Sequence, residues 1–123
     1  MHCFTGAQQE LSDLLALDVY IGITGWVCDD RPERGGAQLS SLLHSIPANR
    51  LMIETDAPYL TPRNIKPASA RPRRNEPALL GHVLCKVALS RGEDVDDVAR
   101  STSQVAVEFF GMPLGTLSGA AQS

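Results

Sequence analysis

The sequence predicts an α/β fold built around a parallel sheet. Short apolar runs rich in β-branched residues alternate along the chain with stretches whose leucines and valines recur at helical spacing. Alternating strands and helices are typical of a parallel sheet, which needs cover on both faces. Three short strands would make only an incomplete layer, so we expect this chain to be a piece of a larger α/β structure.

The first half of the chain contains the predicted strands. Residues 3–6 resemble the end of a strand, and residues 11–17 carry leucines at helical spacing, which predicts a short amphipathic helix. Residues 19–25 are β-branched and aromatic and finish on glycine, as in a buried strand. A second amphipathic helix is predicted at residues 39–46, and the next strand at residues 51–55.

The second half is predicted to be a long loop followed by helices. Residues 57–75 contain four prolines, and a connection of 19 residues without regular structure is more often functional than filler. Helices are predicted from Pro77 to the glycine at position 92, and then as two short segments at residues 95–99 and 105–110. We therefore expect a single partial domain at residues 1–113. The last ten residues, 114–123, are rich in glycine, alanine and serine and are expected to form a disordered tail.

Composition narrows the class of protein. With 123 residues and a formal net charge of -3, the chain is the size of one small domain and is not a general polyanion binder. It has no apolar run long enough to span a membrane and no secretory signal, so we expect a cytoplasmic protein without a membrane partner. Cys3, Cys28 and Cys85 are widely spaced, which favours free thiols in a reducing compartment.

Two candidate metal ligands lie at the ends of predicted strands. His2 and Asp56 would both be at the face where α/β barrels build their active sites. An imidazole and a carboxylate suit a borderline or hard divalent ion, although a metal needs four or more ligands. The alternatives stay open: His2 could be a frayed terminal residue, Asp56 a helix N-cap, and Glu54 an acid satisfied at its strand end.

The long loop is strongly basic. It holds five of the 11 basic residues of the chain and no acid: Arg63, Lys66, Arg71, Arg73 and Arg74. Above the mouth of a sheet, arginine side chains of this kind would bind the phosphate oxygens of a substrate. A solvated run of charge is the other interpretation. Trp26, directly after a predicted strand, could line a cleft or pack beneath the loop.

Four short motifs resemble the TatD-type DNases. They are His-Cys-Phe-Thr-Gly at residues 2–6, Ile-Gly-Ile-Thr-Gly at residues 21–25, Ile-Glu-Thr-Asp-Ala-Pro-Tyr-Leu at residues 53–60, and Arg-Asn-Glu-Pro at residues 74–77. They occur in the order and at the spacing found in that family, and the similarity extends over residues 2–113. The third and fourth motifs together are specific, whereas either alone would be a weak signal.

The resemblance implies the C-terminal fragment, about three β/α units, of an amidohydrolase-like TIM barrel. Such a barrel would cleave phosphodiester bonds in DNA or a smaller phosphoester with two divalent ions, and Mg, Mn and Zn are not distinguished. By similarity, His2 is a ligand of the second metal. Asp56 is a ligand of the first metal and a catalytic residue that takes a proton from the attacking water. The family's other ligands, a His-x-His pair, a bridging Glu and a further His, would all precede His2, so the chain alone is expected to be inactive.

Two other functions remain open. The chain could be an inactive remnant, or the product of a misplaced start, that acts at most as a non-catalytic binding or assembly module. It could also be a half-barrel that assembles with a separate N-terminal half, or with itself, through an open sheet edge.

Overall fold

The computed structural model describes residues 1–113, and the predicted tail at 114–123 lies outside the described residues. The centre of the fold is a pair of parallel strands, β1 (Ile21–Ile23) and β2 (Leu51–Ile53). Ile21 is opposite Leu51 in the register, and Ile23 is opposite Ile53. Both strands are shorter than the sequence predicts, but they lie where it places them.

The third predicted strand, at residues 3–6, is wrong within the part of the chain that the structure describes. The N-terminal segment instead runs beside β1 and makes two backbone hydrogen bonds with it. The N–H of Phe4 donates to the carbonyl of Gly22 at 2.9 Å, and the N–H of Gly22 donates to the carbonyl of Met1 at 2.8 Å. Since both bonds go to one residue, the pairing is too short for a strand, but it still holds His2 beside the sheet.

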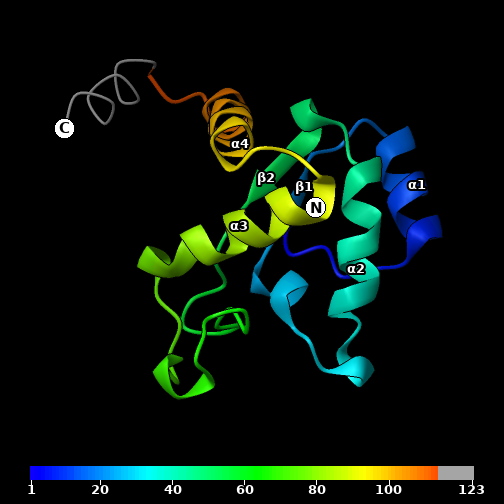
Figure 1. Ribbon diagram of the computed structural model, residues 1–123. Helices are drawn as coiled ribbons and strands as arrows, with labels where there is room; N and C mark the ends of the chain where they lie inside the picture. The colour runs from blue at the N-terminus through cyan, green and yellow to red at the C-terminus, as the bar shows by residue number, and fades with distance from the viewer. Residues whose placement is uncertain (114–123) are drawn as a thin grey trace.

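Within the described residues, the first α-helix precedes β1, the second lies between β1 and β2, and two more follow β2 (Figure 1). They are α1 (Gln8–Ala16), α2 (Gly36–Leu42), α3 (Leu80–Arg91) and α4 (Val95–Phe110). The loop from residue 57 to residue 76 contains one short 3-10 turn, Ala68–Ala70, which agrees with the predicted lack of regular structure. In Figure 1 this loop and the segment that follows β1 hang from the same end of the sheet.

The two short helices predicted at residues 95–99 and 105–110 are one continuous helix, α4, so this prediction was wrong. The polar residues between them contain no glycine or proline, and the buried hydroxyl of Thr102 donates to the carbonyl of Val98 at 2.8 Å. In this helix a threonine bonded back to the preceding turn is accommodated without a break, because no residue of the stretch prevents helical backbone angles. Gly111, with φ of 64°, ends the helix as the sequence predicts.

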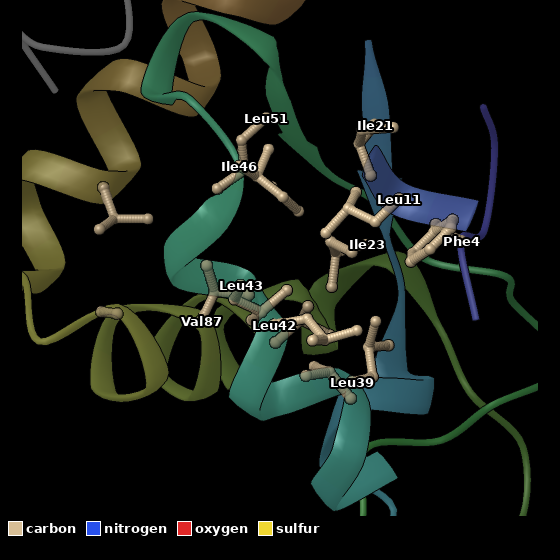
Figure 2. Packing of buried hydrophobic residues seen from close by; sticks show 14 of the residues in the cluster. Phe4, Leu11, Ile21, Ile23, Leu39, Leu42, Leu43, Ile46, Leu51 and Val87 are labelled. Carbon is tan, nitrogen blue, oxygen red and sulfur yellow. The ribbon is translucent and has the colours of Figure 1, made fainter. Parts of the chain in front are cut away.

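One face of the sheet carries the hydrophobic core. Ile21, Ile23 and Leu51 are at most 1% exposed and pack with residues of α1, α2 and α3, among them Leu11 and Leu39 (Figure 2). Each such side chain contributes roughly 1.5–3 kcal/mol relative to an exposed one. The core therefore fixes the strands from the helical side.

The other face of the sheet is open. Gly22, Met52 and Glu54 border a hollow of about 600 Å³, whose rim includes Tyr20 and Phe109. The rings of Tyr20 and Phe109 meet edge to face at 5.1 Å between centroids. Because side chains alternate along a strand, the residues between the core positions face this hollow. In a closed barrel this is the face that turns inward.

The structure bears on two expectations drawn from composition, the free cysteines and the lack of a membrane span, and leaves the third, the location, untested. All three cysteines are free thiols, as their spacing predicts, and burial raises the pKa of Cys28 to about 12. Among residues 1–113, no helix has the length and apolar character needed to cross a bilayer. The cytoplasmic location stays a prediction.

Candidate functional site

A histidine and two carboxylates meet where β1 and β2 end. The imidazole Nδ1 of His2 lies 2.7 Å from Oε2 of Glu54, and the backbone N–H of Cys3 donates to Oε1 of the same carboxylate at 2.7 Å. A carboxylate only accepts hydrogen bonds, so His2 must carry its proton on Nδ1. In the neutral imidazole this fixes the tautomer and leaves the lone pair of Nε2 free.

That free nitrogen faces Asp56. Nε2 of His2 lies 3.8 Å from Oδ1 of Asp56, beyond hydrogen-bond distance. By the resemblance these two residues hold different ions of a pair, and paired ions lie about 3.5–4 Å apart, so ligands of neighbouring ions can approach each other to this distance. The side chains of His2 and Asp56 are 63% and 40% exposed. The donor types and their spacing therefore fit neighbouring ligands of a site for two divalent ions.

Glu54 adds the feature that metal-binding histidines usually have. A ligating imidazole almost always donates its other N–H to a carboxylate or carbonyl, which orients the ring and raises its basicity. Sequence reasoning treated Glu54 only as a possible satisfied strand-end acid. Its position two residues before Asp56 could have indicated the role, since residues i and i+2 of a strand point to the same face.

Room for this carboxylate comes from Gly22. A Cβ atom at position 22 would lie 2.5 Å from Oε1 of Glu54, too close for any real contact. A side chain at position 22 would therefore displace the Glu54 carboxylate, which crosses Gly22 from the residue after β2.

The site is incomplete within the described chain. Residues 1–113 contain no group of three or more His, Cys, Asp or Glu side chains arranged to hold a metal. His2 and Asp56 supply two donors, and any further ligands must come from elsewhere, as the resemblance implies.

The basic loop is only partly gathered at one place. Arg63, Arg71 and Arg73 line a cavity of about 420 Å³, whereas Lys66 and Arg74 are exposed and do not line it. Arg63 pairs with Asp30 at 3.0 Å, and Arg71 donates to the carbonyl of Arg63 at 2.6 Å. Two of the five predicted phosphate ligands therefore also hold the loop together.

Two further arginines complete this cavity, and sequence reasoning missed them. Arg31 and Arg34 come from the segment after β1, which faces the long loop. We call this space the arginine cavity. Trp26 lines it and also packs against the hydrophobic core, so the residue combines a cleft position with a packing role.

A buried acid organises the arginine cavity. Asp29 is 7% exposed and accepts two hydrogen bonds from the guanidinium of Arg31, at 2.9 and 2.6 Å. These bonds, together with the charge of Arg31 and the nearby Arg63, lower the pKa of Asp29 to about 2. An aspartate that is ionised at neutral pH therefore holds the arginines of two loops beside each other.

Asn75 fixes the long loop from within. Asn75 is 3% exposed, and its side-chain NH₂ group donates to the carbonyl of Tyr59 at 2.8 Å. Its backbone N–H donates to the carbonyl of Pro58 at 3.1 Å. Its Oδ1 accepts from the N–H of Glu76 at 2.9 Å, at the start of the helical segment. The asparagine of the fourth motif thus closes the loop that begins after Asp56.

A parallel β/α arrangement with a histidine and carboxylates at its strand ends defines a class: α/β barrels whose site lies at the carboxyl face of the sheet. The sequence profile of the TatD related DNase family matches residues 1–111. The chain belongs to this family.

Curated relatives are similar over almost the whole chain. The "3'-5' ssDNA/RNA exonuclease TatD" of Citrobacter rodentium is 52% identical over 114 residues, which cover 93% of this chain and 42% of the relative. The protein of the same name from Erwinia amylovora is 52% identical over 112 residues, with 91% and 42% covered. The chain therefore spans about two fifths of the length of these relatives.

Solved structures share the fold. A TatD homologue from Escherichia coli K12, YJJV, superposes with a TM-score of 0.75 at 22% identity, covering 92% of this chain and 40% of the homologue. An amidohydrolase from Saccharomyces cerevisiae gives a TM-score of 0.73 at 20% identity, with 88% and 38% covered. These structures are TIM barrels, so the chain has the fold of part of such a barrel, as the sequence predicts.

Proposed function

We propose that this chain forms one wall of a divalent-metal-dependent active site that cleaves phosphodiester bonds. The observation that carries the proposal is the His2 imidazole, held by Glu54, with its free Nε2 directed at Asp56 3.8 Å away. The family to which the chain belongs is generally metal-dependent. Its relatives named as ssDNA/RNA exonucleases support nucleic acid as the substrate.

In this proposal three residues build the metal site. His2 offers Nε2 and Asp56 offers Oδ1 as metal ligands, and Glu54 keeps the His2 ring in the tautomer that leaves Nε2 unprotonated. A bound divalent ion would polarise the phosphoryl group and lower the pKa of a water molecule. An imidazole beside a carboxylate accommodates Zn or Mn and, with more oxygen ligands, Mg, and two ions are proposed for the complete site.

Asp56 has a second proposed task, as the base that accepts a proton from the attacking water. Within residues 1–113, its carboxylate forms no hydrogen bond or ion pair apart from the 3.8 Å pairing with His2. One of its oxygens is thus available to take a proton while the other serves as a ligand. The basic loop, including the exposed Lys66 and Arg74, is proposed to hold the substrate backbone.

The proposed site requires further barrel strands. The open face beside β1 and β2, with its hollow of about 600 Å³, is the face a barrel interior would fill. We propose that the N-terminal half of a barrel covers it, in the same polypeptide or in a separate one. A non-catalytic module that associates with itself through this open face is the alternative, and size-exclusion chromatography with light scattering separates the two.

The test joins this chain to a complementary half. Residues 1–111 replace the matching C-terminal part of the Citrobacter rodentium relative, which gives a hybrid protein, and the two halves are also mixed as separate chains. Release of nucleotides from single-stranded DNA is measured with Mg²⁺, Mn²⁺ or Zn²⁺ and with EDTA. We expect metal-dependent hydrolysis from the hybrid and none from the 123-residue chain alone.

Matched histidine variants complete the test. His2→Ala should abolish the activity of the hybrid, whereas His44→Ala, at an exposed position on the helical side, should leave it unchanged. A hybrid that folds but stays inactive with every metal would contradict the proposal. Hydrolysis by the isolated chain would contradict the need for a second half.

A further inference from the structure

The arginine cavity concentrates positive charge beside the proposed metal site. Five arginines line it against a single acid, Asp29: Arg31, Arg34, Arg63, Arg71 and Arg73. The chain as a whole has a net charge of -3, so this charge is local. Clefts lined by one sign of charge concentrate ligands of the opposite sign.

Some of these arginines have donors to spare. Within residues 1–113, the side chain of Arg73 forms no hydrogen bond or ion pair, and that of Arg34 has only a 3.7 Å approach to Asp29. Nε of Arg71 is buried without a hydrogen-bond partner in the same part of the chain. The guanidinium groups of Arg34 and Arg73 therefore have N–H donors left for an anion in the cavity.

The cavity also has an aromatic side. The guanidinium of Arg34 lies over one face of the Trp26 indole, 5.1 Å from the ring centre. Tyr59 lines the same space and is 70% exposed, although large aromatic side chains are usually more buried. Free guanidinium groups beside an exposed ring are the combination that binds single-stranded nucleic acid.

One backbone hydrogen bond and one side-chain contact connect the cavity to the proposed metal site. The N–H of Tyr59 donates to the carbonyl of Asp56 at 2.8 Å, and Pro58, two residues after Asp56, lines the cavity. Directly after β1, the hydroxyl of Thr24 lies 3.3 Å from the sulfur of Cys3. The next residue, Gly25, also lines the cavity. If a single-stranded nucleic acid placed one phosphate at Asp56, its neighbouring nucleotide would thus lie at the cavity.

We propose that the arginine cavity is a nucleotide subsite that holds single-stranded nucleic acid next to the bond to be cleaved. Arg34 and Arg73 bind its phosphate, and the ring of Tyr59 stacks on its base. The inference rests on the proposed function for its role in cleavage but not for the binding itself. An acidic peptide would use the arginines and gain little from the stacking face.

The chain contains a built-in reporter for the test. Trp26 is its only tryptophan and lies in the cavity, so oligothymidylate bound there should quench the fluorescence of the 123-residue chain. The titration is done in EDTA, without metal, so it is independent of hydrolysis. Inorganic phosphate and poly-glutamate serve as the two other anions.

The variants separate charge from stacking. Arg73→Gln should weaken oligothymidylate binding about three- to tenfold and reduce the salt slope by about 0.7, the value for one phosphate contact on a single strand. Tyr59→Ala should weaken it about tenfold while Tyr59→Phe keeps it, because the ring is what stacks. Arg100→Gln, at an exposed position on α4, should have no effect.

The fluorescence titrations can either support or overturn the nucleotide subsite. Quenching that depends on Arg73 and Tyr59 and not on Arg100 supports the subsite, even if the hybrid protein proves inactive. Absence of saturable quenching by oligothymidylate, equal binding of poly-glutamate, or equal effects of the Arg73 and Arg100 variants overturns it. Fluorescence anisotropy of a labelled oligonucleotide with the same variants of the hybrid, again in EDTA, gives the answer should the isolated chain not fold.

Discussion

Replacing Glu54 with glutamine tests the geometry at the strand ends most directly. The carboxylate accepts two hydrogen bonds, from Nδ1 of His2 and from the N–H of Cys3, each at 2.7 Å. An amide has one acceptor and one donor end. If the oxygen stays with Cys3, the NH₂ group faces Nδ1, and His2 must move its proton to Nε2, the atom proposed to bind metal.

The size of the effect follows from the bonds that are lost. A hydrogen bond to a charged group contributes about 1.5–3 kcal/mol, which is roughly 10- to 150-fold in an equilibrium constant. Loss of the partner that orients a metal-bound histidine typically costs 10–100-fold in metal affinity or activity. We therefore expect Glu54→Gln to lower metal affinity at the His2 side by about 10–100-fold, with little change in volume.

The assay uses the hybrid protein. Metal affinity is measured by isothermal titration calorimetry with Mn²⁺ and Zn²⁺, and circular dichroism checks that the fold is retained. Glu76→Gln, at an exposed acid whose side chain makes no hydrogen bond or ion pair within residues 1–113, is the matched control and should bind metal normally. If Glu54→Gln binds metal as tightly as the unaltered hybrid, the carboxylate does not orient His2 and the reasoning fails.

Three further predictions concern the site and its frame. In the hybrid, Asp56→Asn should reduce hydrolysis by more than 100-fold with the fold intact, because it removes a charged ligand and the proposed base; near-normal turnover would exclude that role. Asn75→Ala should lower the free energy of unfolding by about 1–3 kcal/mol in urea titrations, since it leaves carbonyls of the loop unpaired, whereas exposed Asn49→Ala should change it little. Because the pKa of Asp29 is lowered, its ionised carboxylate adds up to about 2 kcal/mol to the free energy of unfolding, and solvent screening at the half-exposed Arg31 reduces this figure. The contribution is present above pH 4 and is lost as the pH falls towards 2. Asp29→Asn should therefore destabilise the chain at pH 6 and scarcely at pH 2, and an equal effect at both pH values would contradict this.

The sequence predicts the elements well where periodicity and composition agree. The positions of β1 and β2, the helices before Gly92 and the long irregular loop all follow from local patterns. The N-terminal strand and the division of α4 do not. The first fails because strand length is set by pairing partners, and the second because a polar stretch without glycine or proline can stay helical.

For the site, local pattern places residues at strand ends but not their side chains relative to one another. His2 and Asp56 were singled out by position, while the contact between His2 and Glu54 joins residues 52 positions apart. Likewise, Arg31 and Arg34 belong to a segment whose charges are mixed, so nothing in the sequence alone brings them to the basic loop. Only the fold, through Asp29, assembles arginines from both loops.

Contacts at the end of β1 explain the residue types of its motif. Gly22 leaves space for the Glu54 carboxylate, and a Cβ at Gly25 would run into the carbonyl of Leu60 in the long loop. Between them the buried Thr24 accepts from the N–H of Trp26 at 3.3 Å and contacts the sulfur of Cys3 at 3.3 Å. One face of this turn therefore holds the segment that carries His2, and the other starts the wall of the arginine cavity. Because a single short strand end positions both, a change that shifts Thr24 should disturb metal binding and nucleotide binding together, whereas Arg73 and Glu54 should each affect only one.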